Sequence, residues 1–306
     1  MTDWMRRLRG TSPRGDQEAT DGVRLAIGRQ ESRYVRAQTF PSIRQAEFQV
    51  FSQWGEDGII QYLLSKVPIA QPIFVELGVQ DYSESNTRFL LCHDNWRGLI
   101  VDAGGSHQKF LRGQGLDWRY DVTAVSSFVT VENVDSILKN ARIQGEIGLL
   151  SIDIDGNDYW VLKALTAVSP RILIVEYNSV FGWELPVAVP YRADFERGKA
   201  HFSNLYYGAS IAALIGLART RGYVCVGGNS TGNNVFFVRS DVLGSLAEIS
   251  PRDAWAESRF RESRGPDGRL TLLGSHAARL AQIGNLPVLD LAAGTQHAIR
   301  DLPLHA

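Results

Sequence analysis

The sequence has few of the features that mark several large protein classes. Its two cysteines, Cys92 and Cys225, lie far apart in apolar runs, which favours buried reduced thiols and a cytoplasmic protein over a disulfide framework. The 32 basic and 33 acidic residues give a formal net charge of −1, which argues against a nucleic-acid partner. No apolar run reaches the ~18–20 residues of a membrane helix, and no apolar core follows the basic N-terminus as in a secretory signal.

The overall composition is that of a globular protein, and three segments of the chain differ in their sequence patterns. Residues 1 to about 20 are rich in Arg, Gly, Ser, Thr and Asp, and we expect a mobile arm that is dispensable for chemistry. Together with the helical pattern that follows, this arm forms an N-terminal extension of residues 1–45. Strand signals concentrate in residues 46–240, which we interpret as the central domain. Residues 241–306 show short helix patterns near 254–260 and 276–283, which predict a helical extension serving as a lid, an oligomer contact or a wrap.

The central domain contains four continuously apolar runs, at residues 73–79, 99–101, 147–154 and 172–175. Strands that are apolar on both faces are typical of a parallel sheet covered by helices. Amphipathic segments suited to such helices lie at 88–92, 134–141, 159–165 and 209–218. Two short strand patterns, 223–226 and 235–238, flank a Gly/Asn-rich connection and predict an antiparallel hairpin. The predicted fold class is therefore α/β, with a mostly parallel sheet that ends in a C-terminal antiparallel hairpin.

The stretch around Gly78 carries the strongest indication of a ligand. An apolar strand precedes Gly78 at a sharp turn, and a helix-like segment leads to a second strand that ends on Asp102. This arrangement holds adenosine in α/β folds, with the acid on the ribose hydroxyls. Gln80 and Tyr82 stand where a dinucleotide fingerprint needs glycines, so the pattern favours adenosine without pyrophosphate, as in S-adenosylmethionine. We expect Glu76 and Gly78 at this cofactor and Asp102 on its ribose.

Acidic and amide side chains also follow the next two strands, at the sheet edge where ligands bind. Asp153 and Asp155 end one strand, and Glu176 and Asn178 end the other. Asp153 lies among apolar residues, where an unpaired carboxylate is costly, so we assign it a catalytic role. Carboxylate and amide oxygens suit Mg²⁺, which predicts a metal site of Asp153, Glu176 and Asn178. The alternative is that these side chains hydrogen-bond only the substrate or each other.

His201 is the candidate general base. It lies in the long connection between the fifth strand and its helix, a usual place for substrate contacts. Its ordinary pKa of ~6.5 suits proton abstraction. A structural or surface histidine is equally compatible with the sequence.

Four motifs occur in order along the chain: Phe51-Ser-Gln-Trp-Gly-Glu-Asp57, Phe74-Val-Glu-Leu-Gly78, Leu149-Leu-Ser-Ile-Asp-Ile-Asp-Gly156 and Val175-Glu-Tyr-Asn178. Together they resemble the FkbM-like branch of the class I S-adenosylmethionine-dependent methyltransferases. The resemblance implies a Rossmann-like, seven-stranded sheet with helices on both faces, and methyl transfer to a hydroxyl of a sugar or natural product. We also expect Gln53 and Asn86 at the cofactor. Related bacterial sugar O-methyltransferases hold Mg²⁺ with acids at the ends of the fourth and fifth strands.

Three functions compete on these grounds. The first is methyl transfer from S-adenosylmethionine to a hydroxyl of a small-molecule or glycan acceptor. The second is a catalytically silent methyltransferase-like scaffold that binds a partner through residues 241–306, which the strand-end acids argue against. The third is a nicotinamide-dependent oxidoreductase, which the missing glycines argue against. The sequence leaves open which acceptor is used and whether the chain forms a homo-oligomer.

Overall fold

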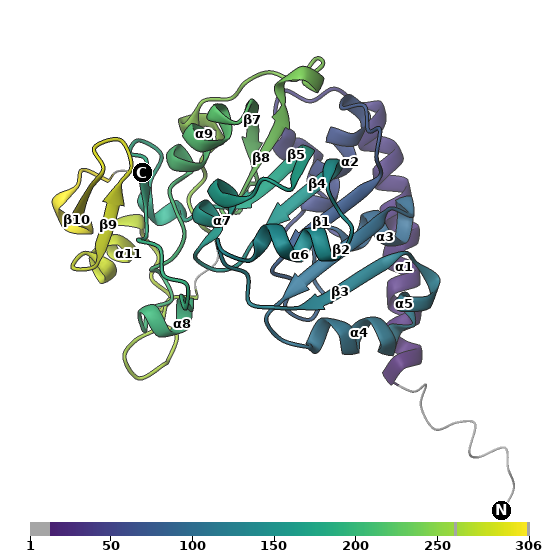
Figure 1. The fold of residues 1–306 in the computed structure, drawn as a ribbon, viewed down its shortest axis with the longest axis horizontal. Coiled ribbons are helices and arrows are strands. Elements are labelled where there is room, and N and C mark those ends of the chain that lie inside the picture. The colour runs from purple at the N-terminus through teal and green to yellow at the C-terminus, as the bar shows by residue number, and fades with distance from the viewer. Residues whose placement is uncertain (1–12, 260–261, 305–306) are drawn as a thin grey trace, which may run out of the picture.

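The computed structural model describes residues 13–259 and 262–304, and a seven-stranded sheet lies at its centre (Figure 1). The strands are β1 (Ile73–Leu77), β2 (Arg97–Asp102), β3 (Val122–Ser126), β4 (Gly145–Ile152), β5 (Val168–Glu176), β7 (Tyr223–Gly228) and β8 (Asn234–Arg239). Their order across the sheet is β3-β2-β1-β4-β5-β8-β7. Neighbouring strands from β3 to β5 are parallel, and β8 runs antiparallel to both β5 and β7. The α/β class, the mostly parallel sheet and the C-terminal hairpin are therefore confirmed.

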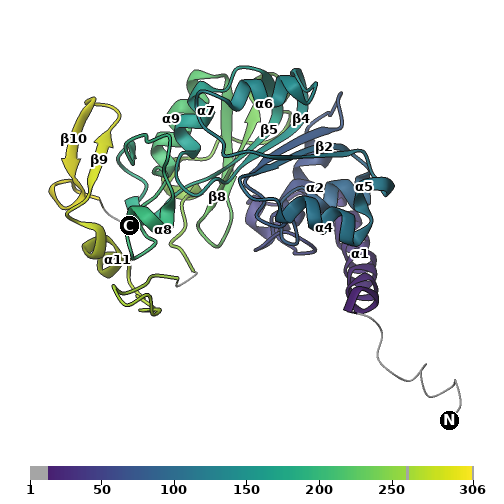
Figure 2. The same cartoon turned by 60° about the horizontal axis from the view of Figure 1, so that its bottom comes forward.

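Helices cover both faces of this sheet (Figures 1 and 2). One face carries α1 (Pro13–Ala37), α2 (Glu56–Lys66), α3 (Arg88–Asp94), α4 (Ser106–Gln114) and α5 (Leu116–Arg119). The other carries α6 (Val134–Asn140), α7 (Asp158–Ala164) and α9 (Ile211–Thr220). Phe74 and Ile100 belong to the first core, whereas Val75 and Leu99 belong to the second. Because successive strand residues point to opposite faces, both sets must be apolar, which explains the continuous apolar runs.

A second sheet of three strands combines two C-terminal strands with one from the connection after β5. It consists of β6 (Val187–Ala188), β9 (Pro287–Asp290) and β10 (Thr295–Ala298), with β9 antiparallel to both of its neighbours. Its core includes Phe181, Ile283 and Val288. The short helices of this region and the connections are α8 (Arg197–Ala200), α10 (Pro251–Ala254) and α11 (His276–Ile283), with 3₁₀ turns at Ile43–Ala46, Ser179–Phe181, Ser240–Val242 and Ile299–Asp301.

The prediction of a wholly helical extension was wrong in part. Helix α11 lies where the sequence predicted it, whereas the helix expected over 254–260 ends at Ala254. The hairpin of β9 and β10 was missed because β9 pairs with β6, a strand far back in the sequence, and local pattern does not report such pairing. The domain boundaries at residues 45 and 240 stay a prediction.

Helix α1 begins at Pro13, inside the segment expected to be an arm, and residues 1–12 of that arm lie outside the described residues. An ion pair holds α1 to the central domain: Arg88 Nη2 lies 2.5 Å from Asp21 Oδ2, and the Arg88 side chain is only 2% exposed. The Arg88 guanidinium also lies 3.9 Å from the centre of the Phe51 ring. The long N-terminal helix is therefore part of the packed structure and not a loose extension.

Two further expectations concern membranes and thiols. None of the helices in residues 13–259 and 262–304 is long and apolar enough to cross a membrane. Cys92 is partly buried and Cys225 is buried, and both carry free thiols. The cytoplasmic location itself stays a prediction.

The ends of β1 and β4 approach each other most closely at Gly78. Gly78 has a φ of 82°, and an added Cβ would lie 1.6 Å from the carbonyl oxygen of Asp153. The Asp153 amide donates to the Leu77 carbonyl at 2.9 Å, and the Gly78 amide donates to the Val101 carbonyl at 2.8 Å. Only glycine fits here, because both the backbone conformation and the space exclude a side chain.

Replacing Asp21 tests the anchor of α1. Asp21→Ala should lower the free energy of unfolding by about 3 kcal/mol, because it leaves the Arg88 charge buried and unpaired. Urea unfolding followed by circular dichroism measures this change. As a control, Asp121→Ala removes an exposed pair with Arg97 at 3.7 Å and should change stability by less than about 1 kcal/mol. Equal losses in the two variants would contradict an anchoring role for Asp21.

A second stability test uses two glycines. Gly78→Ala should lower the free energy of unfolding by more than about 4 kcal/mol or prevent folding, because its Cβ collides with backbone. Gly113→Ala, in α4, meets no atom within 4 Å and should be neutral or stabilising by about 0.4–1 kcal/mol. Thermal melting of both variants decides the question, and a Gly78→Ala protein as stable as the parent would refute the proposed contact.

Candidate functional site

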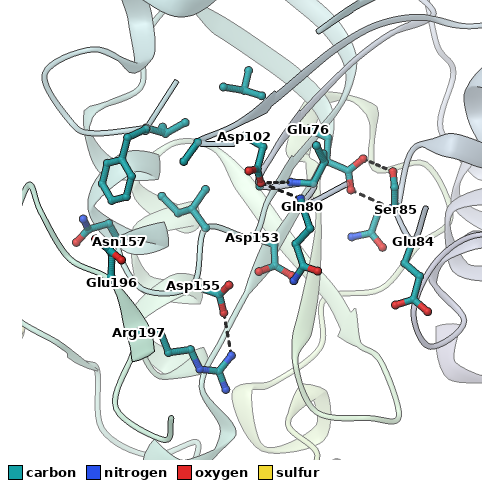
Figure 3. A pocket seen from close by; sticks show the side chains of 18 of the residues that line it. Glu76, Gln80, Glu84, Ser85, Asp102, Asp153, Asp155, Asn157, Glu196 and Arg197 are labelled. Carbon is teal, nitrogen blue, oxygen red and sulfur yellow. Dashed lines mark hydrogen bonds and ion pairs between the residues drawn. The ribbon is translucent and has the colours of Figure 1, made fainter. Parts of the chain in front are cut away.

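A cavity opens at the carboxyl ends of β1, β2 and β4, the edge where ligands of parallel sheets bind (Figure 3). Its volume is about 530 Å³, within the ~300–1,000 Å³ that is typical of small-molecule sites. The residues expected at the cofactor all line it, together with the expected catalytic acid: Gln53, Glu76, Gly78, Asn86, Asp102 and Asp153. The structure therefore brings these six residues together, and what they bind stays a prediction.

Asp102, at the end of β2, closes the turn that follows β1. Its Oδ2 accepts hydrogen bonds from the amides of Val79 at 3.1 Å and Gln80 at 2.8 Å, as Figure 3 shows for these contacts. Its Oδ1 accepts from the Gly104 amide at 3.0 Å. Each carboxylate oxygen offers two acceptor positions, so Asp102 can shape the turn and still accept from a ligand hydroxyl.

Glu76, on β1, fixes the segment before α3. Its Oε1 accepts from the Asn86 amide at 2.9 Å, and its Oε2 accepts from the hydroxyls of Ser85 and Thr87, both at 2.5 Å. Burial raises the pKa of Glu76, and these hydrogen bonds oppose that rise. Asn86 is held in the cavity wall, where its Nδ2 donates to Ser151 Oγ at 3.1 Å. Glu76 thus acts on the cavity through the segment that it orders.

Two buried acids at the start of α2 shape the loop that carries Gln53. Asp57 Oδ2 accepts from the three successive amides of residues 50–52 at 2.7–2.8 Å. Glu56 Oε2 accepts from the amides of residues 54 and 55, each at 3.0 Å. Burial raises the pKa of Asp57 to about 6. The motif of residues 51–57 therefore folds a tight loop, and Gln53 is the residue of this loop that lines the cavity.

Three acidic side chains converge at the ends of β4 and β5. One carboxylate oxygen each of Asp153, Asp155 and Glu176 lies within 4.8 Å of the other two. Burial, followed by the charge of Asp155, raises the pKa of Asp153 well above its ordinary value. Burial, followed by the charge of Asp153, does the same to Glu176, whose buried Oε2 has no hydrogen-bond partner. These three residues, called the acidic triad below, form a group that favours a proton or a cation.

Arg197, in α8, holds the third member of the acidic triad from the other side. Its Nη1 donates to Asp155 Oδ1 at 2.8 Å, its Nε donates to the Asn204 carbonyl at 2.8 Å, and its Nη2 pairs with Glu262 (Figure 3 shows the Asp155 contact). The guanidinium lies 3.8 Å from the centre of the Tyr207 ring. Arg197 therefore positions Asp155 and is already engaged by groups of the chain itself.

The structure does not bring Glu176, Asn178 or His201 to the cavity wall, but a carboxylate oxygen of Glu176 lies within 4.8 Å of Asp153 and Asp155, which do line it. Asn178 Nδ2 donates to the carbonyls of residues 205 and 207 at 2.9 and 3.0 Å, and its Oδ1 accepts from the Val180 amide at 3.0 Å. Asn178 thus caps the turn after β5, because the chain leaves the strand at Glu176. His201 Nδ1 lies 2.7 Å from Ser203 Oγ, and burial lowers its pKa. The geometry therefore does not support Asn178 as a metal ligand or His201 as the general base.

Sequence reasoning missed part of the cavity wall. Asn234 lines the cavity but belongs to a stretch that we interpreted only as a hairpin connection. The available signal was a surplus of asparagine, since Asn229, Asn233 and Asn234 are more than a Gly-rich turn requires. Phe128 lines the cavity after β3, a strand whose residues alternate between partly buried and exposed and so gave no apolar run.

The residues present fit both of the groups that the sequence predicted. The Gly78 turn gives a ligand close access to backbone, and Asp102 stands beside it, as an adenosine cofactor requires. The acidic triad offers three hard oxygen donors, one from a carboxylate with an unpartnered buried oxygen, as Mg²⁺ prefers.

Comparisons with known proteins place the chain in a family. Residues 24–195, more than half of the chain, match the methyltransferase FkbM domain. No curated protein matches.

The solved structures that match are remote. An S-adenosylmethionine-dependent methyltransferase from Clostridium acetobutylicum ATCC 824 has 13% identity and a TM-score of 0.26, over 36% of this chain and 44% of that chain. An O-methyltransferase family protein from Burkholderia thailandensis has 12% identity and a TM-score of 0.36, over 76% and 59%. The N-terminal domain of EvdMO1, solved with SAH and D-fucose, has 12% identity and a TM-score of 0.36, over 61% and 81%.

The chain spans less than two thirds of the length of the first two structures, and scores this low carry no argument about function. The domain match does, because it extends over β1 to β5 and reaches cavity residues from Gln53 to Phe195. The chain therefore belongs to the FkbM methyltransferase family, which supports S-adenosylmethionine as its cofactor.

Proposed function

We propose that the protein transfers the methyl group of S-adenosylmethionine to a hydroxyl of a sugar, glycan or other small natural product. The observation that carries this proposal is that two groups of side chains line one cavity. The Gly78 turn and Asp102 form the first group, called the cofactor end below. Asp153 and Asp155 of the acidic triad form the second, called the acceptor end, and Glu176 lies within 4.8 Å of both without lining the cavity. An adenosine cofactor suits the first end, and an acceptor with hydrogen-bond donors suits the second.

At the cofactor end, the chain supplies a hydrogen-bond acceptor for the ribose hydroxyls and an apolar surface for the adenine ring. Asp102 accepts hydrogen bonds from two turn amides and faces the cavity, so a ribose hydroxyl can add a further donor. Phe128 and Val129, after β3, offer apolar surface to an adenine ring. Gln53 and Asn86 line the same cavity from loops that buried acids hold in place.

At the acceptor end, Asp153 is the base that we assign. The oxygen of the acceptor hydroxyl forms the new bond to the methyl carbon, the bond from that carbon to sulfur breaks, and the hydroxyl proton passes to Asp153. Burial and the charge of Asp155 raise the pKa of Asp153, whereas the charge of Arg197 favours the ionised form that can accept this proton. Asp155, held by Arg197, keeps its carboxylate beside this position.

Asp153, Asp155 and Glu176 would also hold a divalent cation such as Mg²⁺. A bound cation would lower the pKa of the acceptor hydroxyl and orient it. The set differs from the one predicted from sequence, because Asp155 takes the place of Asn178.

The acceptor is identified by a methyl-transfer screen. The purified protein, with labelled S-adenosylmethionine, is offered free sugars, oligosaccharides, nucleotide sugars and small phenols, with and without Mg²⁺. Transfer to a hydroxyl-bearing acceptor supports the proposal. Tight cofactor binding without transfer to any acceptor, or transfer only to nitrogen or carbon, would contradict O-methylation, and failure to bind S-adenosylmethionine would contradict the methyltransferase function.

Asp102 can be tested by binding alone. Asp102→Ala should weaken the binding of S-adenosylhomocysteine by about 10- to 150-fold, the equivalent of ~1.5–3 kcal/mol for a charge-assisted hydrogen bond. Isothermal calorimetry measures the affinity. The control is an analogue of S-adenosylhomocysteine that lacks the ribose hydroxyls, with which the same substitution should have little effect. Equal losses with both ligands would mean that Asp102 acts only through the turn.

The acidic triad can be tested by removing the metal. EDTA should abolish methyl transfer and Mg²⁺ should restore it, whereas Asp153→Asn should not respond to Mg²⁺. His201→Ala is the control and should retain the rate over the pH range of the enzyme, because His201 does not line the cavity. Activity that resists EDTA but is lost in Asp153→Asn would leave Asp153 as a base that works without metal. Loss of activity in folded His201→Ala would return the role of base to His201.

A further inference from the structure

Asn234, the first residue of β8, presents a buried oxygen without a partner. Its side chain lines the cavity, the residue is only 3% exposed, and its Oδ1 makes no hydrogen bond. Its Nδ2 donates to Glu56 Oε1 at 2.9 Å. An ionised carboxylate accepts and does not donate, so Glu56 determines which end of the amide it binds. The nitrogen faces Glu56, and the oxygen faces away from it.

Asn229 reinforces this orientation. Its Nδ2 donates to the same oxygen of Glu56 at 2.8 Å, and its Oδ1 accepts from the amides of residues 232–234 at 3.1–3.2 Å. Rotation of the Asn234 amide would place its oxygen against the Glu56 carboxylate and lose a buried hydrogen bond. Asn234 therefore cannot satisfy its oxygen by turning over.

The residue opposite Asn234 in the sheet also has a buried oxygen without a hydrogen-bond partner. Glu176 on β5 is the cross-strand partner of Asn234, and its Oε2 is also buried and unpartnered. Residues directly opposite in an antiparallel pair lie on the same face, with Cβ atoms ~4.5–5.5 Å apart. Glu176 in turn lies with Asp153 and Asp155 in the acidic triad. Two buried acceptors without donors thus stand side by side at a group of carboxylates.

We propose that Asn234 Oδ1 is the fourth oxygen ligand of a divalent cation at the acidic triad. The inference rests on the cation site of the proposed function and adds Asn234 as its amide ligand. A neutral amide oxygen adds a ligand without adding a fourth negative charge. Mg²⁺ accepts six oxygens, so four protein oxygens leave two positions for the acceptor or water.

The test measures cation binding, not turnover. Mn²⁺ replaces Mg²⁺ in protein without cofactor or acceptor, and electron paramagnetic resonance reports the free ion. The parent protein should bind Mn²⁺, and Asn234→Ala should bind it at least about 10-fold more weakly, a loss that even outer-shell substitutions reach. Asn178→Ala removes an equally buried asparagine and should leave the affinity of the folded protein unchanged. Thermal melting of each variant confirms that it is folded.

Asn234→Ser covers the case in which the alanine variant does not fold. Its hydroxyl keeps a donor for Glu56, but the amide oxygen is removed, so the folded variant should also bind Mn²⁺ more weakly than the parent. Binding equal to that of the parent in folded Asn234→Ala or folded Asn234→Ser would overturn the role of Asn234. The cation site itself would then still stand if Asp153→Asn lost binding.

Absence of Mn²⁺ binding by the parent would overturn the cation site and the role of Asn234 together. Methyl transfer in the presence of EDTA would, in that case, leave the methyltransferase function standing. The experiments therefore distinguish failure of Asn234 as a ligand, failure of the cation site and failure of the methyltransferase function.

Discussion

The backbone contact between the ends of β1 and β4 sets the geometry on which the cavity depends. Gly78 lies so close to the Asp153 carbonyl that any side chain would force the two strand ends apart. The cofactor end of the cavity follows from Gly78 and its turn, whereas the acidic triad begins at Asp153. One contact therefore fixes the distance between the two halves of the proposed reaction. Asp102 extends the constraint to β2, because its carboxylate binds the amides of the same turn.

Buried carboxylates in this protein differ in how far hydrogen bonds satisfy their oxygens. Asp158 is fully buried, but its oxygens accept from the amides of Ile154 and Gly156 at 2.8 and 2.9 Å, so it holds the turn that carries Asp155. Glu76 is satisfied in the same way by the segment before α3. Glu176 is not, since one of its oxygens is buried without a partner. Neither burial nor one unpartnered oxygen indicates function alone, because Asp57 Oδ1 is also buried without a partner while Asp57 Oδ2 holds a loop. Glu176 differs in lying beside two further carboxylates, Asp153 and Asp155.

The parts of the fold predicted from sequence are those where burial leaves a local pattern. Strands β1, β2, β4 and β5 are apolar on both faces. The connection between β7 and β8 is rich in glycine and asparagine, which predicts the hairpin. Strand β3 is half exposed, and β9 depends on a partner distant in sequence, so neither left a clear pattern. The same limit applies to the residues of the site.

Asp153 and Glu176 could be predicted because both stand at the ends of apolar strands that neighbour each other in the sheet. Asn178 could not be judged correctly from sequence, since the chain turns away after Glu176 and uses its amide as a cap. Asn234 could not be predicted, because its role depends on residues that are distant in sequence. Its significance depends on the cross-strand register with Glu176 and on a hydrogen bond to Glu56, and neither is visible in the order of residues.

Residues 241–304, called the C-terminal module here, are joined to the site by more than packing. Arg197 binds Asp155 of the acidic triad and Glu262 of the C-terminal segment with the same guanidinium. Trp255 Nε1 donates to the Ser179 carbonyl at 3.1 Å, which fixes the chain directly after β5. Because Asp155 takes its position in part from Arg197, and Arg197 is balanced by two carboxylates from separate segments, the module contributes to the charge and shape of the acceptor end. It therefore supports the site through Arg197, although none of its described residues lines the cavity.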